Sequence, residues 1–527
     1  MSSEVSGQRA QTVFEDASYH DPHCEEYAKA GARGSQPGNI ARDLRRKMPK
    51  HKKNWMPPYM ARIKVWNPKQ KRLQRVDCAI MLPHELVYSL LIFNDAETLC
   101  SAEGLAYTSK QHLDMCKVKL GTDLVVPLSL WGDGVPCNWD RTESLECVTI
   151  AVPGLSQNCR LPLFGISKKI MIQHQTWDDV FAILSWSFQV LATGIFPDKR
   201  HDGLDWNSSD SRRSRMGAKP IGVQGVLVEV KADWQFLAHT FRFPAHNKNS
   251  GCCWLCKVTP NTMRDFSLTA SWRTERLSHW DLLARWHAEN IPVSTIFRTP
   301  FLQSGCFVLD WLHAVDQGVG ADFLGNCFYY CLDKMPGQNQ VQRTDSLFRL
   351  IQSFYTRNGT EDQLQDLTLL MIKQQKGAKL RSQAAKARAL IPFALELCMD
   401  VLEENDPFEN TMQQAALHLE KAYRNLAVAT FNADHFQLHV RKFLLLWLAL
   451  EAGSPDPTLW RTKPKFHLLA ELSLTKNCPS QQWVYRDEDF GGTAAKLSRR
   501  RGGKNSVLST SRNLLLKFYC NNKVPVL

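Results

Sequence analysis

Residues 124–134 read LVVPLSLWGDG, an apolar run that ends in a Gly-Asp-Gly turn signal. Two more apolar, β-rich runs follow after polar turns, at 145–152 and 161–166. Short apolar runs bounded by turn residues are typical of strands, so we expect three consecutive strands that pair antiparallel. Asp133 then lies at the end of the first strand, where Gly134 leaves backbone room beside its carboxylate.

The next elements extend this pattern. An apolar stretch at 180–196 predicts a buried helix that is too short to cross a bilayer, with Thr176 as its N-cap. A fourth strand is expected at 223–230, and Lys231-Ala232-Asp233 follows it. Three strands, a helix and a fourth strand are the opening order of an RNase H-like domain. We therefore predict an α/β fold with an RNase H-like mixed sheet.

The two flanks of this region have a different character. From about residue 316 to 439 the chain is rich in helix-forming residues with apolar positions three and four apart, which predicts helices at 384–404 and 412–431. A further helix is expected at 442–451. The first 40 residues are polar and aperiodic, a composition that predicts disorder.

The chain is basic, with a net charge of +13 and a pI near 9.0. Positive charge favours a polyanionic partner, because each phosphate neutralised releases condensed counterions. The charge gathers at 42–75, among Trp55, Tyr59 and Trp66, and again at 496–504. The first block could contact nucleic acid, direct nuclear import or be only a solvated segment. Its aromatic residues favour contact with bases or a partner, because stacking on a base is sequence-tolerant. The residues predicted to contact DNA are Arg45, Arg46, Lys47, Lys52, Lys53, Arg499, Arg500 and Arg501.

The 16 cysteines show no regular framework of the kind found in small secreted domains, so we expect reduced thiols. The first 15 residues lack the apolar core of a secretory signal. These features predict a protein without a membrane span, in the nucleus or alternatively the cytoplasm.

Two acidic residues follow strands in a similar way, Asp133 after the first strand and Asp233 after the fourth. Cleavage of a phosphodiester by two metal ions requires carboxylates from separate elements to hold the ions about 4 Å apart. Mg²⁺ suits such a site, because it takes few protein carboxylates and keeps water and substrate oxygens. Taken alone, an Asp-Gly pair after a strand more often marks a turn.

Cys253-x-x-Cys256 has thiolate spacing suited to tetrahedral zinc, although two ligands do not complete a site. His239, His246, Cys252 and His313 could supply the remaining ligands, and the alternative is a pair of buried free cysteines. Asp310-x-x-His313 places both side chains on one helical face. The simpler interpretation is that Asp310 caps a helix with His313 at its third position.

The stretch from Asp310 to Val319, followed by Phe323-Leu324-Gly325, resembles the Asp-x-x-His segment of CACTA (En/Spm-like) and Plavaka-type DDE transposases. The resemblance runs in order over roughly residues 80–510. The other matching segments are Gly132-Asp133-Gly134, Lys231-Ala232-Asp233, Cys253-x-x-Cys256, Lys465-Phe466-His467 and the stretch from Trp483 to Asp489. The chain departs from the family in having Ala232 where a glycine is expected, and in having no recognisable N-terminal zinc finger.

This resemblance implies that Asp133, Asp233 and Glu488 are catalytic and bind two Mg²⁺ or Mn²⁺ ions. The thiol spacing and the Asp-x-x-His segment predict that Cys253 and Cys256 hold a structural Zn²⁺ with His313 or another nearby histidine. Asp205 or Asp210 could replace the second acid, and Glu471 or Asp487 the third. The implied function is DNA cleavage and strand transfer, in a protein that could form a homo-oligomer. The alternatives are a catalytically inactive, domesticated DNA-binding protein and a zinc-stabilised scaffold for protein interactions.

By the same resemblance, the helical stretch is an insertion that interrupts the RNase H-like core before the last acid. The predicted parts are a disordered tail (1–40), a basic arm bearing aromatic residues (41–78), the first part of the core with the Cys-x-x-Cys segment (79–315), the helical insertion (316–460), and the C-terminal part of the core with the last acid and a basic tail (461–527).

Overall fold

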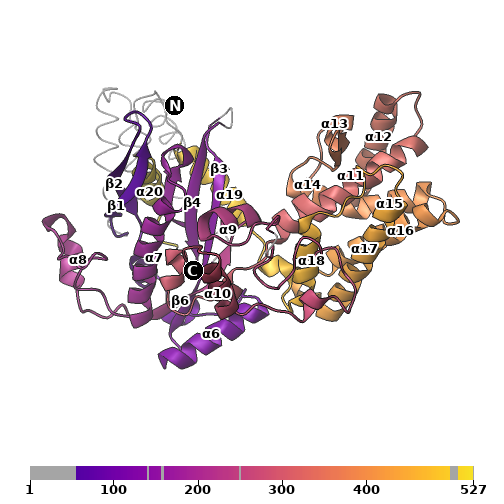
Figure 1. Cartoon of the computed structure of the whole chain (residues 1–527). Coiled ribbons are helices and arrows are strands. Elements are labelled where there is room, and N and C mark those ends of the chain that lie inside the picture. Colours follow the sequence, from indigo (N-terminus) through magenta and orange to yellow (C-terminus); the bar gives the residue numbers. More distant parts are fainter. Residues whose placement is uncertain (1–54, 139–141, 156–158, 249–250, 499–508, 526–527) are drawn as a thin grey trace, which may run out of the picture.

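A four-stranded mixed sheet lies at the centre of the larger part of the protein (Figure 1). The computed structural model describes residues 55–138, 142–155, 159–248, 251–498 and 509–525. The strand order is β5-β4-β3-β6; β3, β4 and β5 pair antiparallel, and β6 runs parallel to β3. The three consecutive antiparallel strands predicted from the sequence are confirmed. The strands are β3 (Val125–Pro136), β4 (Ser144–Ala151), β5 (Leu161–Ser167) and β6 (Gln224–Lys231).

Helices cover both faces of this sheet. On one face α7 (Gln175–Thr193) packs so closely that a Cβ on Gly225 of β6 would lie 2.8 Å from the Leu191 side chain. On the other, α19 (Tyr485–Ser498) approaches β3, and a Cβ on Gly491 would lie 2.8 Å from Val135. The sheet is thus buried between two helical layers, which is why its strands are apolar along almost their whole length.

The remaining elements around the sheet complete these layers. The predicted buried helix at 180–196 corresponds to α7, but Thr176 is not its cap. The helix begins at Gln175, and the Thr176 hydroxyl accepts from the Ile172 amide and donates to the Lys64 carbonyl. The other helices of this part are α4 (Pro83–Leu91), α5 (Ala96–Leu99), α6 (Tyr107–Leu120), α8 (Ser211–Met216), α9 (Trp234–Phe241), α10 (His279–Ala288) and α20 (Thr510–Asn521).

Part of the predicted basic arm belongs to the folded core. The antiparallel hairpin of β1 (Tyr59–Asn67) and β2 (Arg72–Ile80) packs against α7 and α20. Trp55 is buried and donates its indole N–H to the Asn522 carbonyl, and Tyr59 is fully buried. The interpretation of these two aromatic residues as platforms for bases was therefore wrong, because their rings fill the core. The predicted disordered tail and the part of the arm before Trp55 lie outside the described residues.

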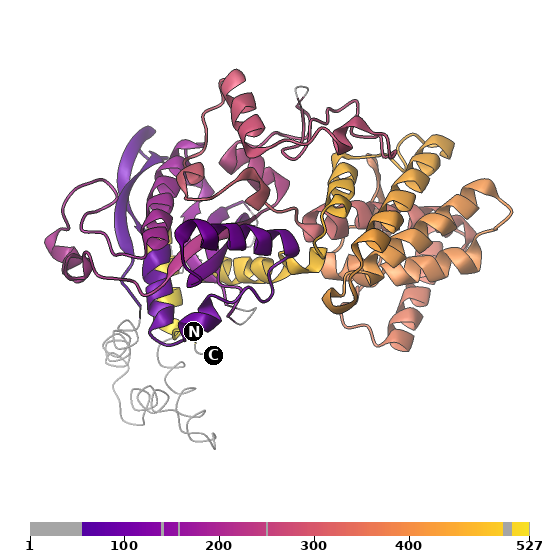
Figure 2. The same cartoon turned by 90° about the horizontal axis from the view of Figure 1, so that it is seen from below.

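The helices from η7 to α18 form a second body, which we call the helical lobe (residues 312–474) (Figure 1). Seen from below, it again lies beside the part that contains the sheet (Figure 2). It extends past residue 460, because α18 packs on α17 and on the π-helix η7. Its helices are η7 (Leu312–Val319), α11 (Gly320–Cys331), α12 (Gln340–Asn358), α13 (Leu369–Ile372), α14 (Ala384–Ala389), α15 (Ile391–Val401), α16 (Pro407–Arg424), α17 (Ala433–Gly453) and α18 (Pro464–Leu474), with a small hairpin of β7 (Lys373–Gln374) and β8 (Gly377–Ala378).

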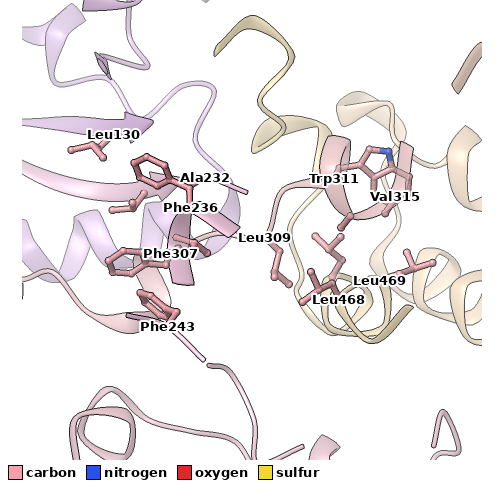
Figure 3. Close-up of a cluster of buried hydrophobic side chains, with 14 of the residues drawn as sticks. Leu130, Ala232, Phe236, Phe243, Phe307, Leu309, Trp311, Val315, Leu468 and Leu469 are labelled. Carbon is pink, nitrogen blue, oxygen red and sulfur yellow. The ribbon is translucent and has the colours of Figure 1, made fainter. Parts of the chain in front are cut away.

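Buried apolar side chains connect the two bodies. Figure 3 shows Phe236 and Phe307 on the side of the sheet, Trp311 and Leu468 in the helical lobe, and Leu309 between them. These side chains belong to one continuous cluster. Fully burying a side chain of this kind stabilises a fold by roughly 1.5–3 kcal/mol, so the cluster fixes the helical lobe relative to the sheet.

Among the described residues, no helix is both long and apolar enough to cross a membrane.

Candidate functional site

Asp133 and Asp233 lie at the same end of neighbouring strands. Asp133 is in β3, which pairs with β6 in parallel register from Val125 to Trp131, and Asp233 comes two residues after β6. Asp233 caps α9, where its carboxylate accepts from the Phe236 amide at 2.5 Å. The prediction that the two strands are neighbours in one mixed sheet is confirmed; Asp133 lies within β3, whereas Asp233 lies just beyond β6. Both side chains line one polar cavity of about 720 Å³.

Glu488 reaches the same region from a distant part of the sequence. It lies in the first turn of α19, the helix that packs on β3 beside Asp133. Its Oε1 atom is buried without a hydrogen-bond partner and lies 3.9 Å from His313 Nε2. Burial, together with the negative charges of Asp133, Asp310 and Asp233, raises the pKa of Glu488 to about 8, although His313 opposes the shift. A half-buried carboxyl group that has an oxygen without a hydrogen-bond donor and lies beside other acids is suited to binding a cation.

Asp310 and His313 form a tight pair next to these acids. Asp310 Oδ2 lies 2.6 Å from His313 Nδ1 and also accepts from the His313 amide, while Oδ1 accepts from the Leu312 amide. Asp310 therefore caps the turn and also contacts the His313 ring. The interpretation of Asp310 as a helix cap is thus compatible with its pairing with His313. Burial lowers the pKa of His313, but its hydrogen bond to Asp310 and the surrounding carboxylates outweigh this and raise it to about 9.

Burial and the nearby charge of Asp233 also raise the pKa of Asp133, while a hydrogen bond from the Gly134 amide opposes the shift. The negative charges of the three acids therefore repel one another. They are more widely spaced than the ligands of a single ion. Within the described part of the chain, the only group of three or more potential ligands that lie within 4.8 Å of one another is at Cys253. A wider spacing suits carboxylates shared between two ions about 4 Å apart.

The alternative acids have other roles. Asp205 is exposed, and Asp210 pairs with Arg213 at 2.8 Å. Asp487 is buried against Arg160, whose Nη2 donates to it at 3.2 Å. Glu471 accepts from Arg276 at 2.9 Å and belongs to a second site.

That second site contains both predicted thiols. Cys253 and Cys256 are fully buried next to His467 and Glu471, which lie one turn apart on α18. The Cys256 sulfur is 3.4 Å from His467 Nε2, and Glu471 Oε1 is 3.4 Å from the same nitrogen and 4.0 Å from the Cys253 sulfur. Burial opposes ionisation of Cys253, but hydrogen bonds from Cys256 and His467 lower the pKa of its thiol.

These four side chains fit a zinc ion. With Zn–S bonds of about 2.3 Å and Zn–N bonds of about 2.0 Å, a tetrahedral site has ligand-to-ligand distances of roughly 3.3–3.8 Å. The observed separations of 3.4–4.0 Å are close to this range. Arg276 would offset the excess negative charge of two thiolates and a carboxylate, and would hold the Glu471 carboxylate in place.

The predicted zinc ligand His313 is not part of this site, and this prediction was wrong. Its ring is turned towards Asp310 and Glu488, because the strong hydrogen bond to Asp310 fixes it there. His239 and His246 are exposed, and the Cys252 thiol donates to the Val258 carbonyl. The sequence did contain a signal for the correct ligands, since His467 and Glu471 have the i, i+4 spacing that places two ligands on one helical face.

A buried carboxyl group holds the start of α19. Asp316 is fully buried and accepts hydrogen bonds from Trp311 Nε1 at 3.0 Å, Tyr423 at 2.7 Å and Tyr485 at 2.6 Å. Tyr423 belongs to α16 and Tyr485 is the first residue of α19. Burial raises the pKa of Asp316 to about 7, against the opposing effect of these donors. The network ties the helical lobe to the helix that carries Glu488.

The residues predicted to contact DNA, Arg45, Arg46, Lys47, Lys52, Lys53, Arg499, Arg500 and Arg501, all lie outside the described residues.

Comparison with known proteins gives no match: neither the protein-family models nor the curated proteins contain one that this chain matches.

Proposed function

We propose that this protein is a transposase-like enzyme that cleaves DNA and transfers the cut strand by two-metal phosphodiester chemistry. The observation that supports this best is the convergence of three acids from segments far apart in sequence: Asp133 and Asp233 line one cavity, and Glu488 lies close enough for their charges to raise its pKa. The orphaned Glu488 Oε1 atom and the mutual repulsion of the acids favour a site built for cations. Oxygen donors of this kind suit Mg²⁺ or Mn²⁺.

The order of the elements also supports an RNase H-like core. Three antiparallel strands precede a helix and a fourth strand that is parallel to the first, and the helical lobe comes before the helix with the last acid. This is the arrangement implied by the resemblance to CACTA and Plavaka-type transposases. We extend the proposal to DNA as the partner, a nuclear location and a homo-oligomeric state.

The chemistry follows from the positions of the side chains. Asp133, Asp233 and Glu488 would hold the ions, while protonated His313 balances part of the negative charge. Bound divalent ions would lower the pKa of the attacking water and stabilise the leaving oxygen. Water would attack the phosphorus and break its bond to the 3′-oxygen, which leaves a 3′-hydroxyl and a 5′-phosphate. The 3′-hydroxyl would then attack a target phosphodiester, form a new phosphodiester bond and displace the target's own 3′-oxygen as a hydroxyl. Cys253, Cys256, His467 and Glu471 would hold a structural zinc that stabilises the fold.

The test is nicking of plasmid DNA with Mg²⁺ or Mn²⁺, together with filter binding on the same preparations. Asp133→Asn should reduce nicking by about 10³-fold or more while DNA binding persists, because the change removes a ligand charge but little volume. Asp205→Asn is the matched control, since Asp205 is exposed, and it should nick like the wild type.

Other outcomes lead to the alternatives. A wild-type protein that binds DNA but never nicks it would be a domesticated DNA-binding protein. A wild-type protein that neither binds nor nicks DNA would support the remaining alternative, the zinc-stabilised scaffold for protein interactions.

A further inference from the structure

A second cavity, of about 520 Å³, adjoins the cavity that contains Asp133. The two share lining residues, among them Asp233, His313 and Lys465. The second cavity continues from the acids towards the helical lobe, where Lys379, Lys463 and Lys465 line it. The first cavity is also lined by Lys168, which follows β5 at the edge of the sheet opposite β6. Both cavities therefore hold lysine side chains in addition to acids.

Two of these lysines are half-buried and lack an acidic partner. Lys379 Nζ donates to the Gln317 carbonyl at 2.6 Å, and Lys465 Nζ to the His313 carbonyl at 2.6 Å. In the described part of the chain, neither has a carboxylate within ion-pair distance, whereas Lys463 pairs with Asp322 at 2.7 Å. Burial and the neighbouring Lys463 and Arg381 lower the pKa of Lys379, with Asp322 opposing. Half-buried cations without a counterion favour binding of an anion.

The backbone holds both lysines in place. A Cβ on Gly318 would lie 2.7 Å from Lys465 Cδ, so only glycine leaves room for this side chain across η7. A Cβ on Gly325 would lie 2.2 Å from Lys379 Cα, so the segment with Lys379 rests directly on α11. Both ammonium groups reach carbonyls of η7 that are one turn apart. The pair is therefore preorganised rather than free to find other partners.

We propose that Lys379 and Lys465 bind a backbone phosphate of the DNA strand, next to the phosphodiester at the acidic residues. The proposal rests on the proposed function, because it assigns the second cavity to another part of the same DNA substrate. A strand that crosses the acids must carry further phosphates on either side of the scissile one, and the lysines lie where such a neighbour would pass. A lysine contact of this kind positions the strand without reading its sequence.

The first experiment is equilibrium binding of a 20-base-pair duplex in EDTA over a salt series. Lys379→Gln and Lys465→Gln should each weaken binding by about tenfold and reduce the log–log salt slope by roughly 0.9. Lys379→Arg should retain most of the affinity. Lys421→Gln is the matched control, an exposed lysine of the helical lobe away from both cavities, and should change nothing beyond its own surface charge. Wild-type affinity in both glutamine variants would overturn the proposal.

The second experiment uses only the wild-type full chain, so it does not depend on the variants folding. Amine acetylation is read by mass spectrometry with and without DNA, and with millimolar pyrophosphate. DNA should protect Lys379 and Lys465 severalfold but leave Lys421 labelled. Protection by pyrophosphate alone would mean a site for small phosphate compounds and would contradict the DNA assignment.

The two proposals can fail separately. Protection of both lysines by DNA without any nicking would keep the phosphate site and reject the enzyme. Nicking that depends on Asp133 without protection of either lysine would keep the enzyme and reject the site.

Discussion

Glu488 is a half-buried carboxyl group beside other acids, and its pKa is raised to about 8. A carboxyl group with a raised folded-state pKa contributes stability that is fully present below its unfolded pKa of about 4.5 and is lost as the pH rises through 8. Glu488→Gln removes this loss. In EDTA at pH 8.5 we expect the variant to melt a few degrees above the wild type, with little difference at pH 4.5.

Thermal melts across this pH range check the prediction. Asp489→Asn on the same helix is the control, since Asp489 is exposed, and it should follow the wild type. Added Mg²⁺ should stabilise the wild type at high pH and should have less effect on Glu488→Gln. A wild-type stability that does not change between pH 4.5 and 8.5 would contradict the electrostatic account of the site.

Asp316, like Glu488, should make the protein less stable as the pH rises. Its pKa is raised to about 7, so its contribution is complete below about pH 4 and is lost as the pH rises through 7. Asp316→Asn should flatten the dependence of the unfolding free energy on pH between these limits. Urea unfolding at several pH values measures this, and an unchanged slope would mean that Asp316 does not titrate in the folded protein.

At the scale of elements, α19 is positioned by the hydrogen bond from Tyr485 to Asp316. Tyr485→Phe removes one donor of a fully buried carboxyl group and should cost about 1–3 kcal/mol of stability. Tyr107→Phe is a suitable control, because Tyr107 is exposed and its hydroxyl accepts a hydrogen bond from nearby Gln111. Urea unfolding compares the two variants. Equal losses of unfolding free energy in the two variants would show that the hydrogen bonds to Asp316 do not hold α19.

The proposed zinc site of Cys253, Cys256, His467 and Glu471 would hold the segment between α9 and η7 against α18. Purified protein should carry one zinc ion per chain, and chelation should lower its melting temperature. Cys256→Ser should lose the zinc, whereas Cys252→Ser should keep it, because the Cys252 thiol lies outside the cluster. Elemental analysis and thermal melts check this. Stoichiometric zinc in Cys256→Ser would reject the ligand set.

The strands of the sheet were predictable because apolar runs bounded by turn residues fix both their positions and their pairing. The positions of Asp133 and Asp233 followed from the same pattern. The ligands His467 and Glu471 did not follow from this pattern, because only the packing of α18 against the Cys253 segment brings them to the thiols. Trp55 and Tyr59 were misread because an aromatic residue among basic residues has the same local pattern in a core hairpin and in a binding arm.

At the scale of the whole molecule, the net charge of +13 should govern affinity for DNA. The log of the binding constant should fall linearly with the log of the salt concentration. Arg500→Gln should weaken binding to all duplexes alike and reduce the slope by roughly 0.9, because a phosphate contact carries no sequence information. Binding curves over a salt series measure this. An affinity insensitive to salt would contradict the proposed mode of binding.

The central claim is that Asp133, Asp233 and Glu488 hold divalent ions together. The most direct measurement is a crystal structure of the full chain with Mn²⁺, with the ions located by anomalous scattering. We expect two ions about 4 Å apart between these three carboxylates, and their loss in Asp133→Asn. Crystals with Mn²⁺ bound elsewhere, or with no ion among the three acids at saturating concentration, would contradict the claim.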